Sequence, residues 1–280
     1  MERVGSTASV SNVLSDLRCY FRTERSTWLD EADRHQLKRL IDLMKLEDEH
    51  ETKQSGAITR EILLRLAAKI DLSSLDERIR FTISFLSHDG LLRGGEVFSG
   101  IEVRDIEWSA DRRSIIITLQ RTKTSLTKPV KIEIAEHDSS DSTHGICGVS
   151  LLRDLFDQLD LWDHPSLQVF PRTTMSKGSK PHLLSVDFKR TYSRTRWIYK
   201  LRKNLSKIGL DPSRYSGHGH RAGGCTDLWD AGVSLPVICR YGRWKQASSA
   251  LRYYREGSKI ARDMAKAFTR NENKRAHKHK

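Results

Sequence analysis

The chain has 280 residues, and its 49 lysines and arginines outnumber 36 acidic residues to give a net charge of +13. This length suits one main domain with a smaller lobe, and no stretch resembles a membrane span or an export signal. The positive charge favours a polyanionic partner, most commonly nucleic acid, over a merely soluble basic protein.

The distribution of charged residues shows which part of the chain is basic, and the cysteines indicate the redox environment. Residues 1–57 hold 9 basic and 11 acidic side chains, whereas residues 58–280 hold 40 and 25, so the basic character belongs to the larger C-terminal part. The four cysteines form no CxxC pair or regular spacing, and a chain of this length can bury a core without disulfides. We therefore expect a reducing, intracellular setting.

Apolar periodicity organises the N-terminal third of the chain. Helical spacing predicts two helices in a short N-terminal piece, at 13–21 and 37–44. The polar run 47–56 has no apolar periodicity and is typical of a linker, so we place a domain boundary after residue 57. Two amphipathic helices, at 62–70 and 79–86, begin the main core.

A glycine-rich turn follows the second of these helices. Two glycines after Arg93 let the backbone turn and bring this side chain inward, with Glu96 three residues further on. A surface ion pair between Arg93 and Glu96 is the alternative interpretation.

A small sheet comes next. Alternating and β-branched residues predict three short antiparallel strands, at 105–108, 114–119 and 129–134. The last two strands enclose a hairpin tip whose basic side chains include Arg121, Lys123 and Lys128. We single out Lys123 as able to reach a cleaved backbone, although most lysines on such tips are merely solvated.

A helix at 149–159 and a loop at 175–181 lead to a cationic segment, 188–210, which we interpret as one helix. Trp197, Leu201 and Leu205 lie on one face of it. No acid stands between the first and last of its positive side chains, which are Lys189, Arg190, Arg194, Arg196, Lys200, Arg202, Lys203 and Lys207. We expect the apolar face to pack and the cationic face to lie along DNA, in preference to a merely solvated basic face.

Residues 218–253, in the C-terminal part of the chain, include side chains that suit the breaking of a phosphodiester. A phosphate under attack gains charge on its oxygens, so it needs fixed cationic donors, an acid for the leaving oxygen and a nucleophile. His218 and Arg221 lie on one helical face, and Tyr253 follows with a hydroxyl. An apolar stripe then predicts a short helix at 260–268, before a basic tail at 274–280.

Taken in order, these residues resemble the tyrosine recombinases, the family of integrases, resolvases and mobile-element recombinases. The resemblance covers residues 58–256. The family places an acid three residues after its first arginine, which matches Arg93 and Glu96, and it places a lysine in a β-hairpin, which matches Lys123.

The second half of the family pattern is an H-x-x-R pair followed by a His or Trp nine residues before the nucleophile. The pair matches His218 and Arg221, and Trp244 leads by this count to Tyr253. The arrangement from Gly242-Arg243-Trp244 through Tyr253-Tyr254-Arg255 resembles recombinases of eukaryotic mobile elements.

The resemblance implies a mainly α (α+β) fold. We expect a helical catalytic domain at 58–256 with a small three-stranded antiparallel sheet, preceded at 1–57 by a short helical N-terminal segment and linker. That segment matches only part of the family's core-binding domain, which closes around DNA. A C-terminal helix and basic tail occupy 257–280, and docking of this helix on a neighbouring subunit or on its own protomer stays open.

The resemblance also implies a mechanism in which Tyr253 forms a 3′-phosphotyrosine. Arg93 and Arg221 stabilise the transition state, while Lys123 protonates the leaving oxygen. His218 contacts the phosphate or helps to take the tyrosine proton, Trp244 donates its indole N–H, and Glu96 orients its neighbours. The ester keeps the bond energy, so we expect no ATP, metal or other cofactor.

The partners implied are double-stranded DNA and further copies of the chain, as a tetramer on DNA, with no membrane. Such a protein acts at DNA, in the nucleus of a eukaryote or in the cytoplasm and nucleoid of a prokaryote. Besides the hairpin residues Arg121 and Lys128, we expect DNA contacts from the cationic segment, at Lys189, Arg190, Arg194, Arg196, Lys200 and Lys203.

Several alternatives accompany these assignments. His220 competes with His218, and Tyr254 with Tyr253, but helix geometry and the count from Trp244 favour the residues named first. A zinc site that includes Cys147 is rejected because the ligand spacing is wrong. At the level of function, a DNA-binding relic without cleavage and a type IB topoisomerase-like enzyme are the alternatives.

Overall fold

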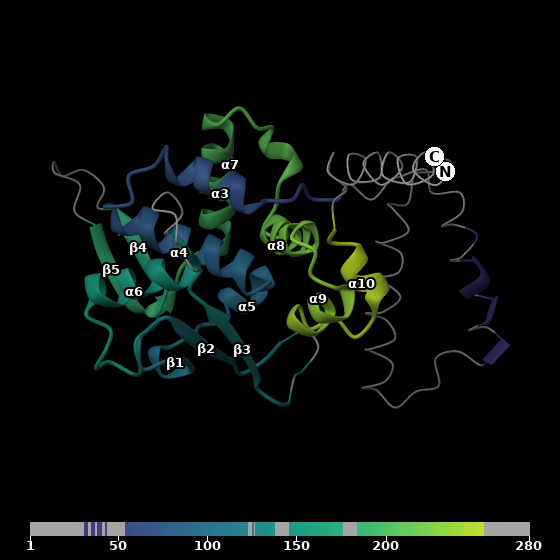
Figure 1. Cartoon of the computed structure of the whole chain (residues 1–280), viewed down its shortest axis with the longest axis horizontal. Coiled ribbons are helices and arrows are strands. Elements are labelled where there is room, and N and C mark those ends of the chain that lie inside the picture. Colours follow the sequence, from purple (N-terminus) through teal and green to yellow (C-terminus); the bar gives the residue numbers. More distant parts are fainter. Residues whose placement is uncertain are drawn as a thin grey trace, which may run out of the picture. The chain divides into compact units, whose positions relative to one another are not determined.

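The computed structural model describes residues 54–122, 125, 127–137, 146–175 and 184–254. Of the first 53 residues it describes only 31–32, 35–36, 38–40 and 43, and all of these are helical. The chain divides into two units, Met1–Gln54 and Ser55–Lys280. The second unit contains the elements labelled in Figure 1. The predicted helices at 13–21 and 260–268 and the basic tail lie outside the described residues.

Helix α4 (Leu75–Asp89) is buried on both sides in the middle of the second unit. Ile79 and Ile83 face a core that α4 shares with the sheet and with α6 (Gly148–Leu159). Phe81 and Phe85 face a second core. Because apolar side chains lie on two sides of α4, both sides must be covered.

The second core lies between α4 and two further helices, α3 (Arg60–Ala67) and α7 (Arg194–Lys207). Helix α3 begins at Thr59, whose hydroxyl accepts a hydrogen bond from the main-chain N–H of Ile62 at 3.5 Å. The predicted helices at 62–70, 79–86 and 149–159 are thus present as α3, α4 and α6.

The predicted three-stranded antiparallel sheet is confirmed. Its strands, in the spatial order β1-β2-β3, are β1 (Ile106–Trp108), β2 (Ser114–Leu119) and β3 (Val130–Ala135). Ile117 pairs with Ile106 on one side and with Ile132 on the other, and all three side chains are buried. Alternate residues of the central strand therefore face the core. With helices making up most of the remaining elements, the mainly α (α+β) class is confirmed.

A second, two-stranded sheet was not anticipated. Strand β4 (Pro171–Met175) pairs antiparallel with β5 (Leu184–Thr191), and α7 begins only at Arg194. The interpretation of 188–210 as one helix was therefore wrong over 188–193.

The physical reason is visible in the chain before Arg194. Leu184, Val186 and Phe188 alternate with polar residues, which is the period of a strand. Ser193 then caps α7, because its hydroxyl accepts a hydrogen bond from the main-chain N–H of Arg196 at 3.3 Å. A cap at this position starts the helix and excludes the preceding residues from it.

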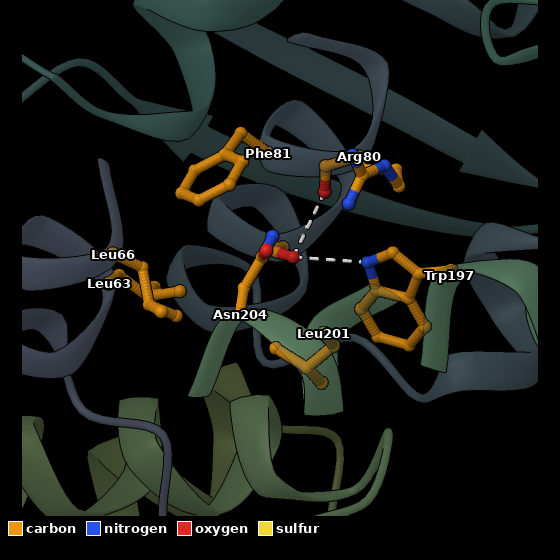
Figure 2. A pocket seen from close by; sticks show the side chains of 8 residues that line it. Leu63, Leu66, Arg80, Phe81, Trp197, Leu201 and Asn204 are labelled. Carbon is orange, nitrogen blue, oxygen red and sulfur yellow. Dashed lines mark hydrogen bonds between the residues drawn. The ribbon is translucent and has the colours of Figure 1, made fainter. Parts of the chain in front are cut away.

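Buried contacts hold α7 in one orientation about its axis. Figure 2 shows Leu201 and Asn204 of α7 beside a small cavity of about 10 Å³, together with residues of α3 and α4. The indole of Trp197 donates to the Ser84 hydroxyl at 3.0 Å, and this hydroxyl donates to the Arg80 carbonyl at 2.9 Å. The opposite, cationic face of α7 is consequently directed away from this core.

Helix α8 (Gly219–Asp230) approaches its neighbours closely. A Cβ on Gly223 would collide with the carbonyl of Ile58, and one on Gly224 would collide with the carbonyl of His88. Three shorter helices complete the unit: α5 (Gly94–Val97), α9 (Leu235–Tyr241) and α10 (Ala247–Leu251). No helix in the part that the structure describes has the length and apolar character of a membrane span.

Candidate active site

Arg93 and Glu96 face each other at the start of α5. The Glu96 carboxylate accepts hydrogen bonds from the main-chain N–H of Arg93 at 2.8 Å and from its guanidinium at 2.7 Å. Glu96 is only 3% exposed and the Arg93 side chain 16%, so this is a largely buried pair and not a surface one. Gly95 has no atom within 4 Å of the place its Cβ would take, which leaves open space beside the pair.

Arg221 is fully buried on α8. Its terminal nitrogens donate to the main-chain carbonyls of Leu91 and Gly242. Its guanidinium carbon lies 4.1 Å from the ring centre of Trp244, a cation–π distance. Burial, reinforced by the neighbouring charges of other arginines, lowers the pKa of Arg221 to about 9. In this conformation the guanidinium lies behind aromatic rings and has no open path to a phosphate.

Trp244 and Tyr253 supply those rings from the α9–α10 region. Their ring centres are 5.2 Å apart, and the Tyr253 ring centre is 5.3 Å from the guanidinium carbon of Arg221. Tyr254 points elsewhere, because its ring packs against Trp229 at 5.0 Å. Of the two tyrosines, Tyr253 is therefore the one beside the arginines.

The structure adds Arg243, which the sequence interpretation did not select. Its guanidinium donates to the Glu96 carboxylate at 3.1 Å and to the Leu91 carbonyl at 3.1 Å. Burial is the largest of the effects that lower its pKa. The sequence signal was weak, since a basic residue beside Trp244 is indistinguishable from a solvated one without its tertiary contacts.

The two candidate histidines differ sharply in burial. His218 is exposed at the N-cap of α8, one turn before Arg221. His220 is fully buried and stacks on Trp197 with ring centres 4.8 Å apart, and burial lowers its pKa to about 3. A neutral, enclosed imidazole is a core residue, so His218 is the histidine that a phosphate can reach. Lys123 lies outside the described residues.

The cationic residues selected for DNA contact occupy several elements. Exposed members are Arg121 and Lys128 near the β2–β3 turn, Lys189 and Arg190 on β5, and Arg194 and Lys203 on α7; Lys200 is half-buried. Arg194 extends toward the candidate site, since its Nε lies 3.5 Å from where a Cβ on Gly94 would be.

Arg196 is placed differently from the others. Its guanidinium contacts the buried Asp76 carboxylate at 3.0 Å and donates to the carbonyl of Thr173. The same carboxylate accepts the Tyr192 hydroxyl at 2.9 Å. These inward contacts use the guanidinium, so Arg196 tethers α7 to β4 and is not retained among the DNA contacts.

A mainly helical domain with this small sheet and this arrangement of elements has the fold of the tyrosine recombinases. No protein-family model matches the chain, and no curated protein matches it in sequence. The fold is seen instead by comparison with solved structures.

The XerH site-specific recombinase bound to palindromic difH substrate, a post-cleavage complex, matches with a TM-score of 0.53 and 14% identity. That likeness covers 79% of this chain and 55% of the XerH chain. The XerA recombinase matches with a TM-score of 0.52 and 12% identity over 94% of this chain and 82% of its own. The chain thus spans about half the length of the XerH chains that it matches. Because the identities are only 12–14%, these likenesses establish the fold alone.

Proposed function

We propose that this chain cuts and rejoins double-stranded DNA through a 3′-phosphotyrosine formed by Tyr253. The observation that supports this most strongly is the proximity of Arg221, Trp244 and Tyr253. The guanidinium carbon of Arg221 and the two ring centres lie 4.1 to 5.3 Å from one another. Arg93 and Glu96 join the same cluster from a distant part of the chain through Arg243. The recombinase structures that share the fold lend further support.

The chemistry requires little beyond positioned charge. The Tyr253 oxygen attacks phosphorus and loses its proton, the bond to the 5′ oxygen of the next nucleotide breaks, and that oxygen takes up a proton. Cationic neighbours favour the phenolate, and guanidinium groups stabilise the charge that develops on the phosphate oxygens. We assign the proton donor to Lys123 and a phosphate contact or proton acceptor to His218. Attack by a 5′ hydroxyl reverses the step and rejoins the strand.

The resting arrangement also sets a condition on catalysis. Arg221 donates to two main-chain carbonyls and is covered by Trp244 and Tyr253. A phosphate must replace at least one of these carbonyls before Arg221 can stabilise a transition state. We therefore propose that DNA binding draws the Arg221 guanidinium from one of these carbonyls to the phosphate while the Trp244–Tyr253 segment stays in place, with synapsis as a tetramer completing the active form.

We place the catalytic domain at 58–256 and assign residues 1–57 to a partial clamp on DNA. The remaining cationic set forms the proposed contact surface: Arg121, Lys128, Lys189, Arg190, Arg194, Lys200 and Lys203. Phosphate contacts of this kind position a protein on DNA without reading its sequence.

The decisive experiment traps the covalent intermediate. Nicked suicide duplexes tiled across the DNA that flanks the coding region are incubated with the protein and resolved on a denaturing gel. Wild type is expected to give a covalent adduct, Tyr253→Phe none, and Tyr254→Phe an adduct within a few-fold of wild type. Tyr254 is a matched control because it differs from Tyr253 by one position and packs on Trp229. An adduct with Tyr253→Phe would mean that the nucleophile is another residue.

The burial of Arg221 also fits a second function, that of a DNA-binding protein that no longer cleaves. This alternative predicts salt-sensitive binding to duplex DNA with no adduct on any duplex. Relaxation of supercoiled plasmid by monomers, without synapsis, would instead indicate a topoisomerase-like reaction.

A further inference from the structure

We infer that Arg243 is a positioning residue that holds the Trp244–Tyr253 segment against Arg93 and Arg221. This inference rests on the proposed function, in which Tyr253 is the nucleophile. It concerns a residue that acts through others and does not itself contact the phosphate.

The first argument is that both terminal nitrogens of the Arg243 guanidinium have partners inside the protein. One terminal nitrogen donates to the carbonyls of Gly90 and Tyr241, at 3.2 and 3.3 Å. The other donates to the Leu91 carbonyl and the Glu96 carboxylate, each at 3.1 Å. The side chain is only 15% exposed. A guanidinium with both terminal nitrogens engaged inside the protein has no free edge for the bidentate grip on phosphate that arginine usually provides.

The second argument is that both ends of this network are shared with the candidate catalytic arginines. The Glu96 carboxylate that accepts from Arg243 also accepts from Arg93. The Leu91 carbonyl that accepts from Arg243 also accepts from Arg221. Arg243 therefore connects Arg93 and Arg221 to the chain that continues directly into Trp244.

The third argument is backbone conformation. Arg243 has φ of +60° and Leu91 has φ of +46°, the left-handed region that non-glycine residues rarely occupy. Such strain persists only where surrounding contacts impose it, and it clusters at functional sites. If position 243 served only to turn the chain after α9, glycine would suit it better. A strained arginine with four internal acceptors indicates that its side chain is needed.

The test uses Arg243→Lys and Arg243→Gly in the full chain. Lysine keeps the charge but cannot reach four acceptors in two directions, and glycine keeps the turn without side-chain contacts. Arg240→Lys is the matched control, since Arg240 is exposed on the same stretch of chain. Three quantities are measured: the rate of adduct formation at saturating suicide duplex, the equilibrium affinity for that duplex with its salt dependence, and amide hydrogen exchange over 247–254.

Both Arg243 variants are expected to form adduct at least 30-fold more slowly, to bind DNA within twofold of wild type with the same salt dependence, and to exchange faster over 247–254. Arg240→Lys should match wild type in all three. A parallel loss of affinity and of salt dependence would make Arg243 a phosphate contact and overturn the inference. So would unchanged adduct rate and exchange, or full activity of Arg243→Gly.

Failure of the proposed function is distinguishable. If wild type forms no adduct, the cleavage reaction is wrong, while hydrogen exchange over 247–254 in Arg243→Lys still decides whether Arg243 holds the segment. Exchange equal to wild type in that variant would reject the positioning role by itself.

Discussion

His88, at the C-terminal end of α4, is buried between the carboxylates of Asp89 and Asp227. One ring nitrogen lies 2.9 Å from Asp89 and the other 2.8 Å from Asp227. His137 approaches the same Asp89 carboxylate at 3.6 Å, and the main-chain N–H of Arg60 donates to Asp227 at 2.7 Å. Although burial opposes the charge, hydrogen bonds to the two carboxylates raise the pKa of His88 to about 9.

This residue predicts a specific pH dependence of stability. The pKa of His88 in the folded chain, about 9, exceeds its ordinary value of 6.5. Its charge therefore stabilises the fold fully below pH 6.5, and the stabilisation is lost as the pH rises through 9. The free energy of unfolding of wild type minus that of His88→Gln should therefore decrease by on the order of 3 kcal/mol between pH 6.5 and pH 9. Urea unfolding at matched ionic strength measures this difference.

His164→Gln is the control, because His164 is exposed on the surface. The difference in free energy of unfolding between wild type and His164→Gln should stay constant over the same pH range. A His88→Gln curve that runs parallel to wild type from pH 6.5 to 9.5 would show that His88 is neutral in the folded protein.

At the scale of the element, α7 combines an anchored face with a cationic one. Trp197 and Leu205 are buried against α3 and α4, whereas Lys203 and Tyr199 are exposed, Tyr199 to 63%. In Figure 1 the three-stranded sheet lies at the other end of the unit from α7. Helix α7 thus carries one part of the proposed DNA-contact surface, and the β2–β3 turn of that sheet, with Arg121 and Lys128, carries another.

Lys203→Gln should weaken binding to duplex DNA and lower the salt dependence. Each lost phosphate contact reduces the slope of log K against log salt by about 0.9. The matched control is Lys131→Gln on β3, whose ammonium is also exposed and pairs with Glu107 at 2.7 Å. Fluorescence anisotropy at several salt concentrations measures both slopes. Equal slopes for Lys203→Gln and wild type would remove Lys203 from the contact surface.

At the scale of the whole molecule, a short strap, residues 55–58, joins the N-terminal end of the second unit to α8. The main-chain N–H of Gly56 donates to the Arg214 carbonyl at 2.7 Å, and that of Ile58 to the Gly219 carbonyl at 2.8 Å. The Ile58 side chain is completely buried. The strap therefore contributes to the core of the second unit.

Two truncations test this contribution. A fragment that begins at Ser55 should unfold with the midpoint of the second unit in the full chain. A fragment that begins at Arg60 should be less stable by roughly 3 kcal/mol or more, because it loses the burial of Ile58, the main-chain hydrogen bonds of Gly56 and Ile58, and the Thr59 cap of α3. Urea unfolding measures the stability of both fragments. The midpoints can be compared if the free energy of unfolding depends on urea concentration with a similar slope in both. Equal midpoints would mean that α8 does not depend on the strap.

Much of the second unit was predictable from local pattern. The three strands of the larger sheet, α3, α4 and α6 follow from periods of 2 and 3.6 residues, which depend on near neighbours alone. The β4–β5 hairpin carried the same kind of signal at Leu184, Val186 and Phe188, but the basic run after it has a helical apolar face and masked the boundary.

By itself, the sequence determined the class of fold and the spacing that selects Tyr253, because both depend on the order of residues along the chain. Only the tertiary structure decided that Arg243 joins the cluster, that Arg221 lies covered in the resting state and that Arg196 pairs with Asp76. Each of these depends on a carboxylate, carbonyl or ring from a distant segment. Whether a guanidinium faces DNA or the interior is set by which acceptors folding brings within reach, and spacing along the chain carries no record of them.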